Sequence, residues 1–335
     1  MTIYWVDLSS QPQYKGFVQR EIAMPRRSNP SDPEAVRQEL LHLIRNFEKE
    51  LKQSDLRTKV KALVLAFHKL RDLGSSLITG IDRKAARNRV LYYILKYPRT
   101  IIEGDELMVV AGISDWPRRV RELRRELGWS IFTGLTLKEM IKEEDFQATW
   151  IKEPNLKVDN YILVSTDQDR EAAHRWKIAN DLRKAKEFGV GQKLLRFLRE
   201  NIGKPVTGEE LRYVANDKTE WARRTRELRT EQGWPVATKF SGRPDLPVGV
   251  YILEQNRQSP AHDRKIPDPI RRQVLRRDDY RCNKCQWHQE LWDKSDPRHL
   301  ELHHRVHHAK RGENTADNLV TYCTSCHDDV HRNEK

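Results

Sequence analysis

Long apolar runs are absent from this chain of 335 residues. No stretch of about 18 consecutive apolar residues exists, which excludes a conventional transmembrane helix. The first residues, MTIYWVDLSS, lack a basic region followed by an apolar stretch, so we expect no secretory signal. We therefore expect a cytoplasmic protein without a membrane partner.

Cysteine is scarce and confined to the C-terminal end, where the four residues form two C-x2-C pairs. They are Cys282, Cys285, Cys323 and Cys326. No cysteine remains for a disulfide framework spread over the chain. In a chain without a secretory signal, such pairs are typical of a structural zinc site. We predict that all four bind one structural Zn²⁺, and the alternative is four reduced thiols without a ligand.

Acidic residues are outnumbered by basic ones. The chain has 49 Asp and Glu against 62 Lys and Arg, for a formal net charge of +13. Such a balance favours a polyanionic partner, usually nucleic acid, over a merely soluble basic protein. The hydrophobic content of 37% is modest, but the length allows several small cores. We expect two or three domains.

Residues 1–80 are expected to form a helical region. Asp32 followed by Pro33 is a typical helix start. Apolar residues then recur at helical spacing in two stretches: Val36, Leu40, Leu43, Phe47 and Leu51, and then Leu56, Val60, Leu63, Phe67 and Leu70. The second stretch is expected to stop at Gly74. The pattern predicts a helical hairpin. Three roles are open for it: packing within the chain, a dimer contact or a DNA clamp.

The middle of the chain contains an internal repeat. GDELMVVAGISDWPRRVRELRRELGW, which begins at Gly104, matches GEELRYVANDKTEWARRTRELRTEQGW, which begins at Gly208. The period of about 104 residues is too long for a solenoid. We predict two copies of one domain, at residues 81–166 and 189–256, with a charged helical linker at 167–188.

Each copy has an apolar helix, a short helix, a longer basic helix (116–127; 221–232) and apolar closing strands. This order resembles a winged helix-turn-helix. In the first basic helix, Trp116 and Val120 fall on the face expected to pack, and Arg118, Arg121 and Arg125 fall opposite. Arginines on that face are expected to reach phosphates or base edges of DNA, unless they form an ordinary solvated face. The matched arginines predicted to bind DNA are Arg118, Arg119, Arg121, Arg124, Arg223, Arg224, Arg226 and Arg229.

The C-terminal segment contains VLRRDDYRCNKC, then LELHHRVHH, then DNLVTYCTSCHDDVH. In order and spacing it resembles the HNH endonuclease family in its four-cysteine zinc form, over about residues 266–335. The resemblance implies a ββα-metal domain, which we place at 262–335. The whole chain is therefore expected to be a multidomain α+β protein.

The same resemblance implies roles for the polar residues of this segment. His303 and His327 would hold a catalytic Mg²⁺ or Mn²⁺, with His331 as a possible third ligand. His304 points to the opposite face of its strand and would be the general base, for which imidazole is suited. Asn318 would brace the catalytic loop, although in isolation it reads as a turn residue.

Some residues depart from the family pattern. Arg305-Val306-His307 stands where an apolar pair and a proline are usual, and His308 is also unexpected. We favour surface or phosphate contacts for both histidines over a role as ligands. Arg311-Gly312 replaces a frequent pair of glycines. Upstream, four arginines of a helix starting at Asp268 either hold the DNA backbone or form a solvated face: Arg271, Arg272, Arg276 and Arg277.

These features predict a sequence-specific endonuclease for double-stranded DNA, similar to type II restriction enzymes. A double-strand break requires two cuts and the chain has one predicted nuclease site, so we expect a homodimer. Three alternatives remain: a modification-dependent restriction endonuclease, a homing or phage-encoded nicking enzyme, and a DNA-binding regulator that keeps the HNH module only as a zinc scaffold.

Overall fold

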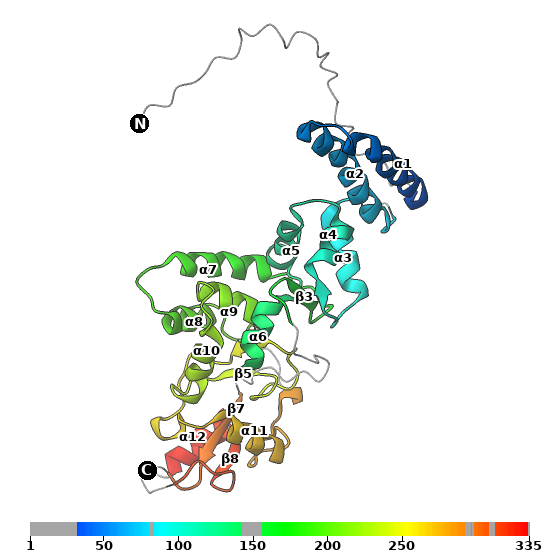
Figure 1. Ribbon diagram of the computed structural model, residues 1–335. Coiled ribbons are helices and arrows are strands. Elements are labelled where there is room, and N and C mark those ends of the chain that lie inside the picture. The colour runs from blue at the N-terminus through cyan, green and yellow to red at the C-terminus, as the bar shows by residue number, and fades with distance from the viewer. Residues whose placement is uncertain are drawn as a thin grey trace, which may run out of the picture.

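The computed structural model describes residues 32–80, 84–142, 156–291, 296, 298–307 and 312–333. It is a succession of helical units with small sheets, from a blue helical pair at one end to an orange and red unit at the other (Figure 1). Within the described residues, no helix combines the length and apolar character needed to cross a membrane. The expectations for residues 1–31, His308 and Arg311 lie outside the described residues.

The N-terminal unit is a pair of helices, α1 (Pro33–Leu51) and α2 (Leu56–Ser76). Asp55 caps α2 by accepting hydrogen bonds from the backbone of Thr58 and Arg57. The helix continues past Gly74, the predicted stop. Gly74 instead lies against α4 (Gly104–Ala111), where a Cβ would come 2.6 Å from the Val109 carbonyl oxygen.

The two repeats have the same order of elements and the same sheet topology. The first has α3 (Ala86–Lys96), β1 (Ile102–Glu103), α4, α5 (Trp116–Arg125), β2 (Ile131–Thr133) and β3 (Asn160–Leu163). The second has α8 (Val190–Arg199), β4 (Val206–Thr207), α9 (Gly208–Val214), α10 (Trp221–Thr230), β5 (Val236–Thr238) and β6 (Val250–Leu253). Their antiparallel sheets have the orders β1-β3-β2 and β4-β6-β5. The sequence pattern did not predict β1 and β4, because two residues are too few to show alternation.

The repeated residues make repeated packing contacts. Gly104 and Gly208 lie against the rings of Trp116 and Trp221, and a Cβ at either position would be 3.0 Å from the ring. Each Trp ring packs edge-to-face against a tyrosine of the central strand, with centroids 5.7 Å apart in the first repeat and 6.1 Å in the second. The matched glycines and tryptophans are therefore explained by the core.

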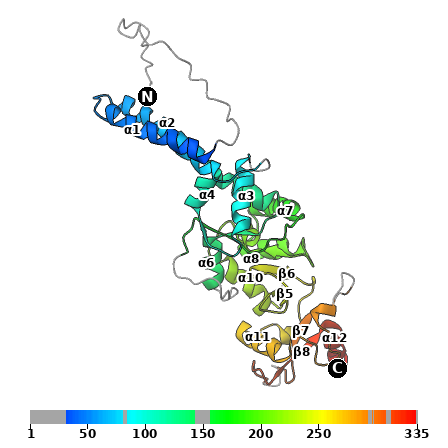
Figure 2. The same cartoon turned by 90° about the vertical axis from the view of Figure 1, so that its right-hand side faces the viewer.

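The segment between the repeats belongs to the core of the second. The helix α7 spans Ala172–Lys184, which is shorter than the predicted linker, and its Trp176 is buried. The helix α6 (Gly134–Lys142), which the sequence did not predict, contributes Met140 to the same apolar cluster. The repeats are consequently joined by apolar packing, and α6 lies beside the helices of the second repeat in both views (Figure 1 and Figure 2).

Ion pairs join the first repeat to the second and the second repeat to the C-terminal unit. In α5, the Nη1 atom of Arg124 donates to Oε2 of Glu209 on α9 over 2.6 Å. The matching arginine of α10, Arg229, donates from Nε to Oδ1 of Asp268 over 2.8 Å, at the start of α11 (Asp268–Arg277). Burial opposes ionisation, but Arg229 holds the pKa of Asp268 below its ordinary value. These two arginines, predicted to bind DNA, are engaged in contacts between units.

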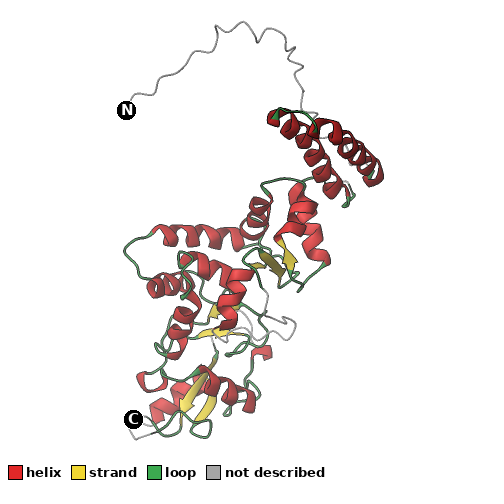
Figure 3. Ribbon diagram, in the orientation of Figure 1, coloured by secondary structure: helices red, strands yellow, loops and turns green. Residues whose placement is uncertain are grey.

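The C-terminal unit consists of two strands followed by a helix, as predicted. Its elements are η3 (Ala261–Asp263), α11, η4 (Gln289–Leu291), β7 (Leu300–His304), β8 (Leu319–Cys323) and α12 (Thr324–Asn333). The strands are antiparallel, and His303 is opposite Val320 (Figure 3). Leu302 and Leu319 pack with Val274 and Leu275 of α11 in a small core.

Candidate metal centre and nucleic-acid interface

The four cysteines come together, and their sulfur atoms lie within 4.8 Å of one another. The Sγ atoms of Cys285 and Cys323 are 3.6 Å apart. This is far beyond a disulfide bond of about 2.05 Å. It is close to the roughly 3.8 Å between sulfurs that each lie about 2.3 Å from a tetrahedral zinc ion. The geometry fits the predicted structural Zn²⁺.

The environment of the cysteines also favours a metal. Burial opposes ionisation of Cys282, but hydrogen bonds from backbone amides lower the pKa of its thiol to about 7. Burial raises the pKa of Cys326. A cation that binds all four would have to displace the remaining protons, so zinc affinity is expected to rise with pH.

A second cluster lies between β7, α12 and η3. It contains Asp263, His303, His327 and His331, whose ligand atoms also lie within 4.8 Å of one another. Oδ2 of Asp263 is 3.0 Å from Nε2 of His327 and 3.2 Å from Nε2 of His331. The His303 Nδ1 atom is 3.6 Å from the same oxygen. All four side chains converge on one point.

The donor set fits a divalent cation. Ligands held about 2.1 Å from an ion at tetrahedral or octahedral angles are roughly 3.0–3.4 Å apart. The two Nε2 atoms of His327 and His331 are 2.9 Å apart, and the distances to Asp263 are similar. Three imidazoles and one carboxylate suit a first-row divalent metal. His303, His327 and His331 were predicted as ligands from the sequence, and Asp263 was not.

Asp263 contacts histidines on both faces of β7. It is fully buried at its side chain. Oδ2 faces the three histidines, while Oδ1 is 2.6 Å from Nδ1 of His304 and accepts a hydrogen bond from the His304 backbone amide over 3.2 Å. Burial alone would raise the pKa of this carboxyl group, but hydrogen bonds from histidines, including His303 and His304, hold it far below its ordinary range. Asp263 is therefore a carboxylate.

A second buried carboxylate, that of Glu301, orients His327 through the ring nitrogen that does not face Asp263. Oε2 of Glu301 is 2.7 Å from Nδ1 of His327, and its Oε1 is 3.3 Å from Nε2 of His299. The Nε2 atom of His327 is thereby left to face Asp263. Burial opposes the charge, but Asp263 and Glu301 raise the pKa of His327 to about 9. A carboxylate behind a ligating imidazole fixes the orientation and tautomer of the ring.

His304 points away from the histidine cluster, as strand alternation predicts. Its Nε2 atom is 2.8 Å from Oδ1 of Asn314, and Nδ2 of Asn314 donates to the Lys265 carbonyl oxygen. Because the Asn314 amide is oriented by Lys265, its oxygen accepts the Nε2 hydrogen of His304. Burial disfavours the cation, but the hydrogen bonds to Asp263 and Asn314 raise the pKa of His304.

Asn318 braces the loop after β7. Its Oδ1 accepts from the Val306 amide over 2.9 Å, and its Nδ2 donates to the carbonyl oxygens of Val306 and Glu313. Gly312 fits tightly here, since a Cβ would lie 1.6 Å from the Val306 oxygen. Next to this loop, the ring of His307 is 5.5 Å from that of His303, at the edge of the cluster.

Exposed and half-buried arginines of the two basic helices have matched partners: Arg118 and Arg223 are exposed, and Arg119 and Arg224 are half-buried. Arg118 and Arg119 both pair with Glu122, at 3.1 and 2.7 Å. In the second repeat, Arg223 and Arg224 both pair with Glu227, at 3.4 and 2.8 Å. Arg121 is exposed beside the first set. Arg125, in contrast, stacks on the rings of Trp176 and Tyr213, with 4.9 and 4.4 Å from its guanidinium carbon to the ring centroids.

A groove of about 520 Å³ leads from α10 towards the His304 side of the C-terminal unit. Three basic residues line it, Arg226 from α10, Arg272 from α11 and Lys265 between them, against two acidic ones, Glu231 and Asp268, of which Asp268 is paired with Arg229. Asn314, the partner of His304, lies on the same groove. Arg277 was predicted near DNA, but it donates to the Ala316 and Leu319 carbonyl oxygens and holds the strands in place.

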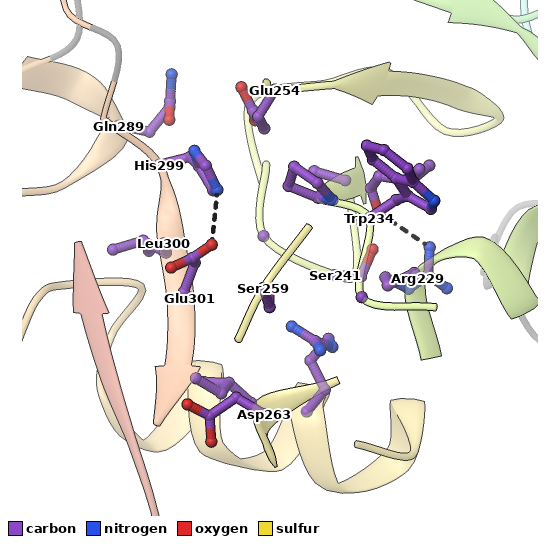
Figure 4. Close-up of a pocket in the computed structure, with 17 residues that line it drawn as sticks. Arg229, Trp234, Ser241, Glu254, Ser259, Asp263, Gln289, His299, Leu300 and Glu301 are labelled. Atoms are coloured by element: carbon purple, nitrogen blue, oxygen red, sulfur yellow. Dashed lines mark hydrogen bonds and ion pairs between the residues drawn. The ribbon is translucent and has the colours of Figure 1, made fainter. Parts of the chain in front are cut away.

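A smaller cavity of about 30 Å³ lies where the second repeat meets β7 (Figure 4). His299 and Glu301 line one side, Trp234 and Arg229 line the other, and Asp263 lies at its edge. Nδ1 of His299 and Nε1 of Trp234 are buried there without a hydrogen-bond partner among the described residues. The volume has room for about two water molecules, which would supply these partners.

The chain contains an HNH endonuclease domain: the model of that family matches residues 282–333. A second family model, the KpnI N-terminal domain, matches residues 87–164 and 191–254. These two segments coincide with the repeats, from α3 to β3 and from α8 to β6. Searches of curated proteins and of solved structures found no similar protein.

Zinc removal tests the cysteine site. Cys282→Ser should lose the bound Zn²⁺ and unfold the C-terminal unit, because the metal links its two C-x2-C pairs and contributes directly to folding. Metal analysis of the purified protein and its thermal unfolding profile measure both effects. Ser325→Ala, an exposed position beside Cys326, is the matched control and should keep one zinc per chain. A Cys282→Ser protein with full zinc content and unchanged unfolding would contradict the assignment.

Proposed function

We propose that this protein is a sequence-specific endonuclease for double-stranded DNA, of the type II restriction class, that hydrolyses phosphodiester bonds with a divalent metal. One observation carries the proposal: the cluster of Asp263, His303, His327 and His331 lies beside His304 in a unit that matches the HNH endonuclease family. The match of both repeats to the N-terminal domain of KpnI, a restriction enzyme, supports the restriction class.

The catalytic cation would be Mg²⁺ or Mn²⁺, and three imidazoles with one carboxylate favour Mn²⁺, because Mg²⁺ prefers oxygen ligands. When bound, it supplies positive charge to the phosphate and lowers the pKa of water. Zn²⁺ at the four cysteines has a separate, structural role. Glu301 keeps His327 oriented, and Asn318 keeps the loop that follows β7 in place.

His304 is the proposed general base, through Nδ1. Asn314 accepts the Nε2 hydrogen, which leaves Nδ1 as the nitrogen directed at Asp263 and the metal cluster. In the neutral ring Nε2 carries the one hydrogen, and Nδ1 has the electron pair that would accept a proton from water. The imidazolium so formed would donate from Nδ1 to Oδ1 of Asp263, which is also a member of the metal cluster.

The repeats are the proposed DNA readers, each a winged helix with α5 or α10 as the recognition helix. Exposed arginines on these helices would contact phosphates and base edges. Arg124 and Arg229 are reassigned to fixing the units to each other, because both are engaged in ion pairs with the next unit. The corresponding division has the helical pair α1 and α2, readers at 81–166 and 189–256 and the nuclease at 262–335, with the predicted linker at 167–188 packed on the second reader through α7.

Contacts between the second repeat and the C-terminal unit would fix the distance between the base pairs that α10 reads and the phosphodiester bond that is cut. The Arg229–Asp268 pair joins α10 to α11, and Arg257 forms two hydrogen bonds with Asp328 of α12, of 2.8 and 2.7 Å. The basic groove of Arg226, Lys265 and Arg272 connects α10 to the His304 side. A DNA backbone that follows this groove would reach the metal cluster at a fixed offset from the base pairs read by α10.

Cleavage of both strands requires two cuts, and one such centre was found among the described residues, so we propose a homodimer on DNA. Digestion of methylated and unmethylated genomic DNA with Mg²⁺ or Mn²⁺, followed by sequencing of the ends, tests the overall proposal. Defined ends in unmethylated DNA support it, whereas cleavage of methylated DNA alone supports the modification-dependent alternative. A protein that binds but never cuts would be the regulator.

The general base is tested by substitution. His304→Ala should reduce the cleavage rate ~100- to 10,000-fold while specific DNA binding remains, because a positioned base contributes about that much. Asn314→Ala should reduce the rate ~10- to 100-fold, since it orients the ring without reacting. Timed digestion and a binding assay in Ca²⁺ measure the two properties. His174→Ala, at an exposed position of α7, is the control. Near-normal cleavage by His304→Ala with loss of cleavage in His307→Ala would refute this active-site assignment.

Reading is tested at the exposed arginines. Arg118→Ala with Arg121→Ala should weaken DNA binding and lower its dependence on salt, because each lost phosphate contact reduces the salt slope by ~1. The second-repeat pair, Arg223→Ala with Arg226→Ala, should have the same effect. Binding isotherms at several salt concentrations provide the measurement.

The control pair for this test is Lys138→Ala with Arg170→Ala, which removes the same charge from exposed positions elsewhere on the repeats. Arg229→Ala should instead lower the free energy of unfolding by ~3–5 kcal/mol, because it leaves Asp268 buried without its partner. Unchanged selectivity and salt dependence in both arginine pairs would exclude the basic helices as readers.

A further inference from the structure

The helix α2 carries an exposed apolar stripe at heptad spacing. Its residues recur at intervals of four and three: Leu56, Val60, Leu63, Phe67 and Leu70. Their exposed fractions are 42–72%. Alternating intervals of four and three make the seam along which one helix packs against another. The sequence predicted a helical hairpin here and left packing, a dimer contact and a DNA clamp open as its role; among the described residues the stripe has no cover.

The contacts of α2 within its own chain use other positions. Ala66 is 5% exposed, and Lys69 pairs with Glu39 of α1, so this side of α2 faces α1. The C-terminal end of α2 rests on α4 through Gly74, and Arg71 donates to the Gly112 carbonyl oxygen over 3.3 Å. From this end the hairpin extends away from the repeats in both views (Figures 1 and 2). None of the described residues outside the hairpin therefore covers the stripe.

We propose that the α2 stripe is the interface of a homodimer, covered by the hairpin of a second copy. Heptad spacing identifies the occupant as a helix, because knobs at these positions fit the holes of a facing helix. A second copy supplies that helix from the same surface, as a two-fold interface requires. The choice of a second copy rests on the proposed function. Besides the cysteine site, one metal cluster was found among the described residues, whereas DNA has two strands to cut. A second copy would bring a second cluster.

The stripe supplies a large part of the apolar area of a stable dimer interface. Its five side chains leave on the order of 500 Å² of apolar surface in water, more than half of the roughly 800 Å² that each partner buries in a standard interface. Val64 and Leu77, which are 44% and 62% exposed, lie at the edges of the same helix face. A monomer seldom leaves so large an apolar surface exposed on one small unit without a binding role.

Sedimentation of the full-length protein without DNA tests the interface. Wild type should be a dimer at micromolar concentration, and Leu63→Glu with Phe67→Glu should dissociate ~100- to 1,000-fold more readily, because four apolar side chains per dimer become charged. The control is Val158→Glu with Leu291→Glu, at positions that are 63% and 60% exposed outside the hairpin. It should remain dimeric. A monomeric wild type, or a stripe variant that dimerises like the control, would overturn the proposal.

A second variant controls for misfolding caused by the introduced charges. Leu63→Gln with Phe67→Gln keeps the net charge and should also weaken the dimer while the far-ultraviolet circular dichroism of the protein is unchanged. Loss of helix in this variant would likewise overturn the proposal, because it would show that the stripe packs within its own chain.

DNA cleavage separates this proposal from the function on which it rests. The monomeric stripe variant should still nick supercoiled plasmid but form linear plasmid far more slowly than the control. If wild type dimerises through the stripe and does not cut any DNA, the nuclease proposal fails and the interface stands. If wild type cuts both strands as a monomer in solution and on DNA, the interface fails and the nuclease stands.

Discussion

The buried carboxylate of Asp263 is the contact on which the rest of the site depends. One of its oxygens lies among His303, His327 and His331, and the other holds Nδ1 of His304. An ionised carboxylate without solvent is costly unless it is paired. Here histidines surround it, and a cation would complete the neutralisation. The same group thus orders the metal ligands on one face of β7 and the proposed base on the other.

The position of Asp263 depends on contacts beyond the nuclease unit. It lies on the short η3 segment, between the second repeat and α11. That segment is held where the Ser259 amide donates to the Gly233 carbonyl oxygen and where Arg229 pairs with Asp268. Gly233 is the matched glycine at the end of the basic helix, and it has a positive φ of 72°. The contacts at the end of α10 therefore help to fix the segment that carries Asp263.

Local spacing was enough to predict some of these features and not others. The paired cysteines, the His327 and His331 interval on one helix face, and the repeat all depend on short-range patterns. Asp263 and Asn314 were missed because each reaches His304 from a segment without periodicity, 41 and 10 residues away in sequence. Glu301 was within reach of prediction, because alternation places it on the same face of β7 as His303.

The arginines show what the sequence pattern of a single helix does not predict. The pattern of α5 and α10 correctly separates an apolar face from a basic one, with Leu123 and Leu228 buried. It does not show that the next unit presents Glu209 or Asp268 to one basic position, so Arg124 and Arg229 were grouped with the exposed arginines. The stripe of α2 has the same origin: its periodicity predicts a helix with a packing surface and does not say which chain covers it.

Binding of Mn²⁺ to the Asp263→Asn variant is the most direct test of the central role of this carboxylate. Calorimetric titration of the zinc-loaded full-length protein would compare it with wild type and with Asp329→Asn, a half-exposed position on α12 outside the cluster. Loss of one cation ligand and of its charge predicts binding weaker by ~10- to 100-fold or more in Asp263→Asn alone. Equal Mn²⁺ affinity in all three proteins would contradict the account.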